Sequence, residues 1–329
     1  MTTDARLLVA LRAAGVHLLP GDLAAQLAVP LVEIETAIAR LCDAGFDIET
    51  KPGLGCRLLT SPDRLIADDL HARLGDCSLA REILVFSETS STNDVASRLG
   101  RQGHAGGLAV FAERQTAGRG RFGRRWDSAD HAGLWFSLLL RPELLTAHWP
   151  RLTTWAGVAV ATAIEQFTGI PAKLKWPNDI LIAGKKVTGI LIESANDDAG
   201  APFIVAGIGV NVNQADFPPE IADRAASLRQ ITGRTIERPA LAAAILRALS
   251  ARIAAVAHDF PSLLADATRR SALLGSWVRL HSGAVHFEGT AESLDADGNL
   301  LLRLVDGTLQ RMTAGEVTTH APACVTGLF

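Results

Sequence analysis

A basic, glycine-rich loop between two apolar segments constrains the fold of this chain more than any other feature. Residues 118–125 read GRGRFGRR, and the segments 108–112 and 134–140 on either side have the composition of strands. Glycine lets a backbone approach a ligand closely, and arginine guanidinium groups match carboxylate or phosphate oxygens. Long loops held by a sheet are often functional. The sequence therefore predicts an anion-binding loop, with a solvated basic loop as the alternative.

Two more polar segments lie in similarly apolar surroundings. The first, residues 173–194, reads KLKWPNDILIAGKKVTGILIES, and the second, residues 205–213, reads VAGIGVNVN. Pro177 favours an extended Trp176, and Gly184 marks the turn of a hairpin. Short connections predict mostly antiparallel pairing, and the amphipathic segment 151–169 predicts a helix with a buried stripe. The centre of the chain is therefore predicted as an α/β domain with a mixed sheet.

The glycines of GIGVN, residues 207–211, do not form a dinucleotide-binding fingerprint. The third glycine, the following helix and the later ribose-binding acid are missing from this part of the sequence. We interpret these glycines instead as positions where a ligand approaches the face of the sheet closely.

Composition narrows the class of protein. The length of 329 residues suggests two or three domains, and 48% apolar with 20% charged residues predicts a sizeable core. A net charge of -3 gives no global argument for nucleic-acid binding. The first residues lack the basic leader of a signal peptide. The sequence contains no run of about 18 apolar residues, so we expect no membrane span. Cys42, Cys56, Cys77 and Cys324 lack the spacing of a zinc site or a disulfide framework, so we expect a cytoplasmic protein.

The first 62 residues have the pattern of helix, helix, turn, helix and hairpin. Apolar residues recur at helical spacing, the third helix stops at Gly45, and a Pro-Gly turn separates two short strands. A DNA-reading helix needs Lys or Arg for phosphates and Arg, Asn or Gln for bases. The third helix offers Arg40 alone, and residues 1–60 carry five basic against seven acidic side chains. Operator binding therefore stays open, with a vestigial or protein-contacting domain as the alternative.

The remaining segments have simpler patterns. Residues 63–81 are interpreted as a linker with one short helix, and residues 221–270 as helical. After Gly275 the chain alternates short strands with turns, which predicts a small barrel. His281 and His286 lie there without the spacing of metal ligands, so we interpret them as surface histidines.

Four motifs in this order resemble the biotin protein ligase family. They are SETSSTND at residues 87–94, the GRGRFGR loop, KWPND at residues 175–179 and GKKVTGILIE at residues 184–193. The resemblance implies an α/β (α+β) fold with a central mixed-sheet domain similar to class II synthetases. The implied domains are a winged helix-turn-helix at residues 1–62, a linker at 63–81, the ligase domain at 82–270 and an SH3-like barrel at 271–329.

The family's reaction makes biotinyl-5'-AMP from biotin and ATP with magnesium, and then transfers biotin to a lysine of a biotin carboxyl carrier protein. A carboxylate must approach a charged α-phosphate, so the site needs cations more than a nucleophile. By resemblance the catalytic residues are Lys186, Arg121 and Asp179, with Asp179 near magnesium or the incoming amine. The implied biotin contacts are Ser91, Thr92, Asn93, Gln115, Arg119, Gly120, Arg121 and Lys186. The implied nucleotide contacts are Gly118, Arg119, Arg121, Lys175, Asn178 and Asn211.

Several of these residues also have purely structural interpretations. Ser91 or Thr92 can cap the helix that follows. Lys186 can be an exposed hairpin lysine like Lys185, and Asp179 can belong to a turn. Trp126 is as compatible with packing as with ligand contact.

Two other functions stay open. Lipoate or octanoate ligases and transferases share the central architecture, although we expect them to lack the GRGRxGR loop. A biotin-sensing transcriptional regulator would bind its ligand without turnover. The arginine-rich loop beside Lys186 favours turnover, and the acidic third helix argues against DNA. The expected partners are a biotin carboxyl carrier protein and, through an exposed sheet edge, a second copy of the chain.

Overall fold

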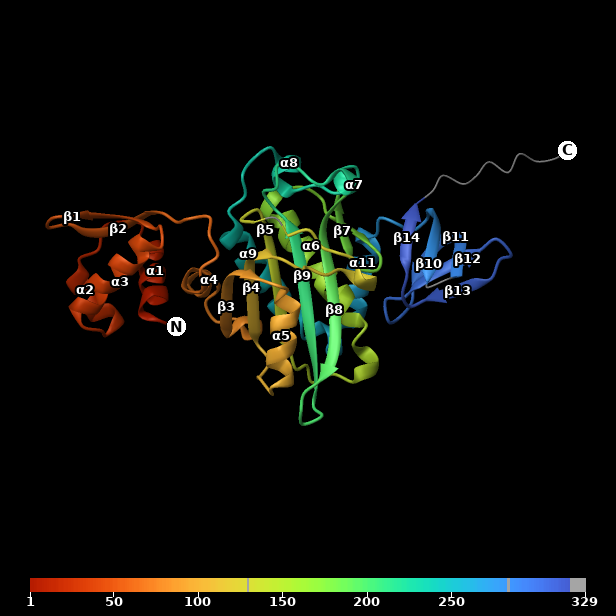
Figure 1. Cartoon of the computed structure of the whole chain (residues 1–329), viewed down its shortest axis with the longest axis horizontal. Coiled ribbons are helices and arrows are strands. Elements are labelled where there is room, and N and C mark those ends of the chain that lie inside the picture. Colours follow the sequence, from red (N-terminus) through yellow and green to blue (C-terminus); the bar gives the residue numbers. More distant parts are fainter. Residues whose placement is uncertain (129, 283–284, 320–329) are drawn as a thin grey trace.

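The chain forms three packed units in a row in the computed structural model, which describes residues 1–128, 130–282 and 285–319. A small helical unit comes first, a central sheet covered by helices follows, and a small all-β unit lies at the opposite end (Figure 1). Cys324, one of the four scattered cysteines, lies outside the described residues.

The central unit is built on one seven-stranded sheet with the order β3-β4-β5-β9-β8-β7-β6. Strands β3 and β4 are parallel, and every other neighbouring pair is antiparallel. The predicted mixed sheet is therefore confirmed. The strands are β3 Glu82–Thr89, β4 Leu108–Gln115, β5 Gly133–Leu140, β6 Lys173–Lys175, β7 Asp179–Ile182, β8 Lys185–Asn196 and β9 Pro202–Asn211.

The two faces of the central sheet have different partners. One face carries Leu134, Phe136 and Leu138 of β5 into a large core with the helices α6 Arg151–Thr168, α9 Arg238–Arg252 and α11 Phe260–Arg270. The opposite face packs at one end against α5 Thr92–Arg101. Alternation along a strand sends successive side chains to opposite faces. The rest of this second face is therefore free to build a pocket.

Helix α9 belongs to the core of the central unit. Residues 238–258 are long and apolar enough to cross a membrane by length and composition alone. Leu241, Ile245 and Leu249 of this segment are nevertheless fully buried, and Leu249 accepts a hydrogen bond from Trp155 of α6 through its carbonyl oxygen at 3.1 Å. Buried helices of packed domains share this composition. We therefore describe α9 as a core helix.

The first unit has its own small core. It contains α1 Thr3–Ala14, α2 Pro20–Leu27, α3 Leu31–Asp43 and the hairpin of β1 Asp47–Lys51 and β2 Gly55–Thr60, in the predicted order. Thr2 caps α1 by accepting from the Ala5 backbone N–H at 3.1 Å, and Gly15 ends it in the left-handed conformation. Leu8, Leu23 and Ile34 meet in the interior.

The segment between the first two units is packed rather than extended. It contains α4 Ala67–Leu74 and the short helix η1 Ser78–Ala80, and Leu70 is fully buried in the central core. The carboxylate of Asp69, itself 1% exposed, pairs with Arg12 of α1 and with Arg73 at 2.8 Å. Residues 63–81, expected as a linker, thus fasten the first unit to the second.

A buried arginine strengthens this connection. Arg238 is fully buried and forms ion pairs with Glu113 of β4 at 2.5 Å and with Asp63 at 3.3 Å. Glu113 in turn accepts from the backbone N–H of Leu65 at 2.7 Å. Buried charges need such partners, because desolvation of an unpaired ion is costly. One network therefore joins residues 63–65, β4 and α9.

The last unit is a five-stranded antiparallel sheet with the order β13-β12-β11-β10-β14. Leu280, Leu300 and Leu302 form part of its small core. The predicted short strands after Gly275 are confirmed and form this sheet, and their closure into an SH3-like barrel stays a prediction. The strands of this unit are β10 Trp277–Ser282, β11 Val285–Leu294, β12 Leu300–Leu304, β13 Leu309–Met312 and β14 Glu316–Thr319.

Three short helices lie between β9 and the last unit: α7 Pro219–Ala222, α8 Leu228–Thr232 and α10 Ala255–His258.

Candidate active site

A pocket of about 890 Å³ opens on the free face of the central sheet. Its walls come from the basic loop, the segment 175–179, the segment 217–225 and the last unit of the chain. These segments are far apart in the sequence. Residues 91–93 and 207–211 also line the cavity, so the sheet gathers all four of the predicted polar segments around it.

The floor of the pocket is a pair of glycines covered by an indole ring. A Cβ atom at Gly189 or at Gly209 would lie 2.6 Å from the ring of Trp126. Trp126 also meets Trp135 edge to face, with ring centroids 6.2 Å apart. Gly209 is one of the two glycines of residues 207–211 that we interpret from the sequence as sites of close ligand approach, and for it the interpretation is wrong. A side chain of the basic loop occupies the space above it.

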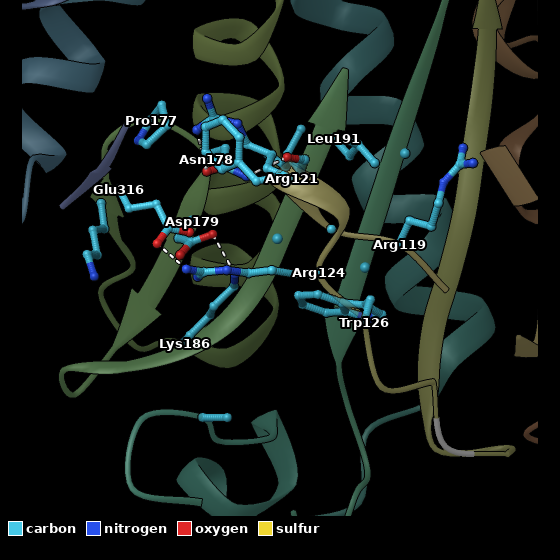
Figure 2. A pocket seen from close by; sticks show the side chains of 18 of the residues that line it. Arg119, Arg121, Arg124, Trp126, Pro177, Asn178, Asp179, Lys186, Leu191 and Glu316 are labelled. Carbon is cyan, nitrogen blue, oxygen red and sulfur yellow. Dashed lines mark hydrogen bonds and ion pairs between the residues drawn. The ribbon is translucent and has the colours of Figure 1, made fainter. Parts of the chain in front are cut away.

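Lys186 and Asp179 form an ion pair beside this indole ring. Lys186 Nζ lies 2.6 Å from Asp179 Oδ1 and 5.2 Å from the centroid of Trp126. The backbone N–H of Lys186 donates to the Arg224 carbonyl at 2.7 Å, which anchors β8 at this point. Lys185, by contrast, is exposed and donates to the carbonyl of Ala222 at 3.4 Å. Figure 2 shows Lys186 and Asp179 pointing toward each other.

Two further cations are half-buried nearby. Arg121 donates to Asn178 Oδ1 at 3.5 Å and to the carbonyl of Gly315 at 3.4 Å. Burial lowers the pKa of Arg121, and the negative charge of Asp179 opposes this shift. Burial also lowers the pKa of Lys175, and Asp179 again opposes it. Cations that have lost water in this way are well suited to bind an anionic ligand.

Arg119 points in another direction. Its guanidinium pairs with Asp94 at 2.8 Å and with Glu193 at 3.2 Å. In Figure 2 it lies on the other side of Trp126 from Asp179 and Lys186. The structure therefore brings Arg121 to the ion pair and leaves Arg119 at the opposite end of the pocket.

The glycines of the loop shape its backbone. The backbone N–H of Trp126 donates to the Gly118 carbonyl at 2.8 Å, and a Cβ at Gly118 would lie 2.7 Å from the Trp126 carbonyl oxygen. The backbone N–H of Gly120 donates to the Arg124 carbonyl at 2.7 Å. The loop is thus folded back on itself, and only Phe122 among its non-glycine residues at 118–126 has positive φ.

Four of the predicted biotin contacts, Ser91, Thr92, Asn93 and Gln115, lie together at the start of α5. Ser91 occupies the N-cap position without a side-chain capping bond, so the capping interpretation is wrong for its hydroxyl. The Thr92 backbone N–H donates to Gln115 Oε1 at 2.8 Å, and Gln115 Nε2 donates to Ser128 Oγ at 2.9 Å. Asn93 is 4% exposed and donates to Glu193. The structure therefore collects these side chains in one buried polar group.

The two remaining predicted contacts, both asparagines, hold the backbone. Asn178 Nδ2 donates to the Ile190 carbonyl at 2.7 Å. Asn211 Nδ2 donates to the Lys186 carbonyl at 3.4 Å, and Gln214 Nε2 donates to Asn211 Oδ1 at 3.3 Å. Both asparagines line the pocket while they fix the strands that carry Lys186.

The sequence did not reveal the contribution of the last unit to the pocket. Gly315, Glu316 and His281 line the cavity, and Glu316 forms an ion pair with Arg124 of the basic loop. His281 Nδ1 lies 3.2 Å from His286 Nδ1 across β10 and β11. The Arg124–Glu316 pair joins residues that are 192 positions apart, so no local pattern predicts it.

The described residues offer little for a resident metal. No group of three His, Cys, Asp or Glu side chains among residues 1–128, 130–282 and 285–319 could hold a metal ion. Asp179 is the predicted oxygen ligand, and it is paired with Lys186. Magnesium commonly binds through one or two carboxylates together with substrate phosphates. The donor set fits an ion that arrives with a triphosphate.

Comparisons with known proteins agree with this geometry. Residues 85–213 match the biotin/lipoate A/B protein ligase family, and residues 273–318 match the biotin protein ligase C terminal domain. The first range contains the predicted motifs, and the second contains the sheet that closes the pocket.

Individual relatives extend the match over most of the chain. The bifunctional ligase/repressor BirA of Bacillus subtilis is 35% identical over 82% of this chain and 84% of its own length. The biotin--[acetyl-CoA-carboxylase] ligase of Mycobacterium tuberculosis is 36% identical over 78% of this chain and 94% of its own length. The solved Aquifex aeolicus biotin protein ligase in complex with biotin and ATP has 33% identity and a TM-score of 0.65, covering 73% of this chain and 99% of its own. The chain therefore belongs to the biotin protein ligase family.

Proposed function

We propose that this chain activates biotin with ATP and transfers it to a lysine of a biotin carboxyl carrier protein. The observation that carries the proposal is one pocket that holds the Lys186–Asp179 ion pair, the half-buried Arg121 and the polar group at the start of α5. An acid activated by a nucleotide needs cations at one end and a recognition site for the acid at the other. This pocket offers both.

In the first step a biotin carboxylate oxygen bonds to the α-phosphorus of ATP, and the bond from that phosphorus to pyrophosphate breaks. Both reactants carry negative charge. Lys186, Arg121 and Lys175 supply positive charge where the carboxylate and the phosphate meet, and they are held in place before the ligands arrive. Release of pyrophosphate leaves biotinyl-5'-AMP in the pocket.

The rest of the pocket divides between the two substrates. Ser91, Thr92, Asn93 and Gln115 hold the ring of biotin, and Gly118 to Arg121 enclose the carboxylate and adenylate. Asn178 and Asn211 border the nucleotide. The guanidinium of Arg119 is paired with Asp94 and Glu193, and it must leave them before it can contribute its charge to the adenylate. We therefore assign the first contacts with the ligand to the backbone of Arg119 and Gly120.

Magnesium bound with the triphosphate would add a Lewis acid that neutralises phosphate charge. Asp179 is the residue that would hold it, because its carboxylate is the predicted oxygen ligand beside Lys186. Asp179 also keeps Lys186 oriented toward the pocket.

In the second step the amine of the carrier lysine attacks the biotinyl carbonyl, and AMP leaves as the anion. The amine must lose a proton, and Asp179 is the nearby carboxylate that we assign to receive it. Arg121 retains the adenylate until the carrier arrives. The folded loop excludes water and so limits hydrolysis of the mixed anhydride.

The first step can be tested by itself. Purified chain with ATP and magnesium should release pyrophosphate when biotin is added, and mass spectrometry should detect biotinyl-5'-AMP. Lipoate or octanoate in place of biotin should give no comparable release. Turnover with lipoate alone would favour the acyl ligase alternative, and tight biotin binding without pyrophosphate would favour a sensor.

We propose that residues 1–62 form a winged helix-turn-helix domain, and that this domain does not bind a specific DNA operator. Four of its five cations are already engaged: Arg6 with the Leu27 carbonyl, Arg40 with Asp4 and Lys51 with Glu49 within the unit, and Arg12 with Asp69 of α4. Phosphate contacts supply most non-specific DNA affinity. The exposed face of α3 carries Val32, 65% exposed, and the acidic Glu35, whereas a DNA reader would carry basic or amide side chains on such a face.

We propose the domain boundaries 1–62, 63–81, 82–270 and 271–329, with a cytoplasmic location for the whole chain. Its protein partner would be a biotin carboxyl carrier protein. Strand β3 lies at the edge of the central sheet, and such an edge can pair with a second copy of the chain.

A further inference from the structure

A buried amide lies behind the proposed ring pocket where three strands meet. Asn93 packs against Gly207 of β9, where a Cβ would come within 2.2 Å of Asn93 Oδ1. Ser137 of β5 pairs with Gly207, and Glu193 of β8 lies two residues beyond Leu191, the other partner of Gly207. Residues at this spacing share one face of a sheet. Ser137 and Glu193 therefore flank Asn93 on the same side.

The orientation of the Asn93 amide follows from these two partners. Asn93 Nδ2 donates to Glu193 Oε2 at 2.6 Å. A carboxylate only accepts, so a reversed amide would set two oxygens against each other. Asn93 Oδ1 therefore faces inward, where Ser137 Oγ donates to it at 2.5 Å. Arg119 Nη2 contacts the same Glu193 oxygen at 3.2 Å and holds the carboxylate in position.

Ser137 has one hydroxyl hydrogen and two acceptors within reach, Asn93 Oδ1 at 2.5 Å and Thr92 Oγ1 at 2.7 Å. While Asn93 Oδ1 faces inward, the shorter contact takes the hydrogen. The 2.7 Å contact between the two hydroxyls also needs a hydrogen, so the Thr92 hydroxyl supplies its own to Ser137 Oγ, while Gln115 Oε1 accepts from the Thr92 backbone N–H at 2.8 Å. The lone pairs of Thr92 Oγ1 are then available to a ligand, and Thr92 presents an acceptor to the pocket.

We propose that Glu193 is a positioning residue that sets the hydrogen-bond polarity of this pocket and so selects rings that offer an N–H donor to Thr92. The inference rests on the proposed biotin ligase function. A cyclic urea carries N–H donors, whereas the dithiolane ring of lipoate carries none. A site built for a polar partner rejects an analogue that lacks it, because its own buried groups are left unpaired. Glu193 acts through Asn93 and Ser137 without touching the ring.

Removal of the Glu193 carboxylate should reverse the chain of hydrogen bonds. Arg119, which only donates, would become the neighbour of Asn93 and would favour an amide with its oxygen outward. Ser137 would then accept from Asn93 Nδ2 and give its hydrogen to Thr92 Oγ1. One acceptor site of Thr92 would be occupied before the ligand arrives.

The test is calorimetric titration of biotin into the full-length protein and its variants. Glu193→Ala should weaken biotin binding roughly tenfold, as expected for a compromised hydrogen bond to a buried polar group. Glu193→Gln keeps an acceptor oxygen and should stay within about threefold of the parent protein. Asp94→Asn loses the other carboxylate beside Arg119 and should stay within about twofold.

A second substitution distinguishes polarity from general damage. Ser137→Ala removes the hydrogen that is redirected to Thr92, so Glu193→Ala with Ser137→Ala should bind biotin more tightly than Glu193→Ala alone. A structural defect would add to the loss instead. The proposal is overturned if Glu193→Ala binds like the parent, or if the double variant binds no better than Glu193→Ala. Failure of the parent protein itself to bind biotin would overturn the proposed function, and this inference with it.

Discussion

Lys186 and Lys185 are adjacent lysines with different surroundings, which makes them a matched pair. Lys186 Nζ lies 2.6 Å from Asp179 inside the pocket, whereas Lys185 is exposed. Lys186→Ala should slow biotin-dependent pyrophosphate release by about 10²–10³-fold, because a fixed charge at the reacting phosphate is lost. Lys185→Ala should change the rate less than about twofold. Equal rates for the two variants in a pyrophosphate assay would return Lys186 to the role of a surface lysine.

Arg121 provides a test of the second half-reaction. The hydrogen bonds of its guanidinium to Asn178 and Gly315 are long, at 3.5 and 3.4 Å, so it can exchange them for contacts with the adenylate. Arg121→Gly should fold normally yet release biotinyl-5'-AMP, which would then label lysines of unrelated proteins. Labelling of serum albumin, followed by mass, measures this escape. A variant that retains the adenylate as well as the parent does would contradict the assignment.

At the scale of elements, Gly189 of β8 and Gly209 of β9 leave the space that Trp126 occupies. A Cβ at Gly209 would lie 2.6 Å from the indole ring, so Gly209→Ala must displace the ring or the strand. We expect a loss of about 1–3 kcal/mol in the free energy of unfolding, together with slower adenylation. Thermal unfolding, near-ultraviolet circular dichroism and pyrophosphate release measure these effects.

Gly21 is the control for that substitution. It lies within α2, and an added Cβ would meet no atom within 4 Å. Gly21→Ala should be neutral or stabilise the protein by about 0.5–1 kcal/mol, since alanine favours helices over glycine. If Gly209→Ala were equally harmless, Trp126 would not depend on the flat sheet surface.

The sequence predicted well those turns and helix starts that depend on the conformational preferences of a few neighbouring residues. Gly184 marked the turn between β7 and β8, and both Ala183 and Gly184 have positive φ there. Residues 221–270 were predicted as helical, and Pro239 lies in the first turn of α9, where proline is favoured. The packing of residues 63–81 was harder to predict. Leu70 is one apolar residue of a predicted linker, and only the folded structure shows that it is buried in the central core.

The site shows the same division between local and distant information. The motifs around Ser91, Arg121, Asp179 and Lys186 predicted the lining of the pocket because they are continuous in sequence. Glu193 and Glu316 join Asn93 and Arg124 across 100 and 192 residues, so no periodicity or spacing predicts those pairs. The direction in which Arg119 points also depends on such distant carboxylates.

For the whole molecule, the first unit poses the sharpest question. Four of its five cations are engaged, and α3 begins with the exposed apolar residues Leu31 and Val32. Selection from a randomised duplex library, with biotin and ATP present, should therefore enrich no sequence. Anisotropy should give dissociation constants weaker than about 10⁻⁶ M at physiological salt. An enriched palindrome bound at nanomolar concentration would contradict this expectation and assign the chain a repressor function.

The central claim is biotin transfer, and one measurement tests it directly. The purified chain is incubated with ATP, magnesium, biotin and a biotin carboxyl carrier domain, and the intact mass of the carrier is recorded. The account predicts addition of one biotin to a single lysine, dependent on both ATP and biotin. An unmodified carrier, in a preparation that a known biotin ligase does modify, would contradict it.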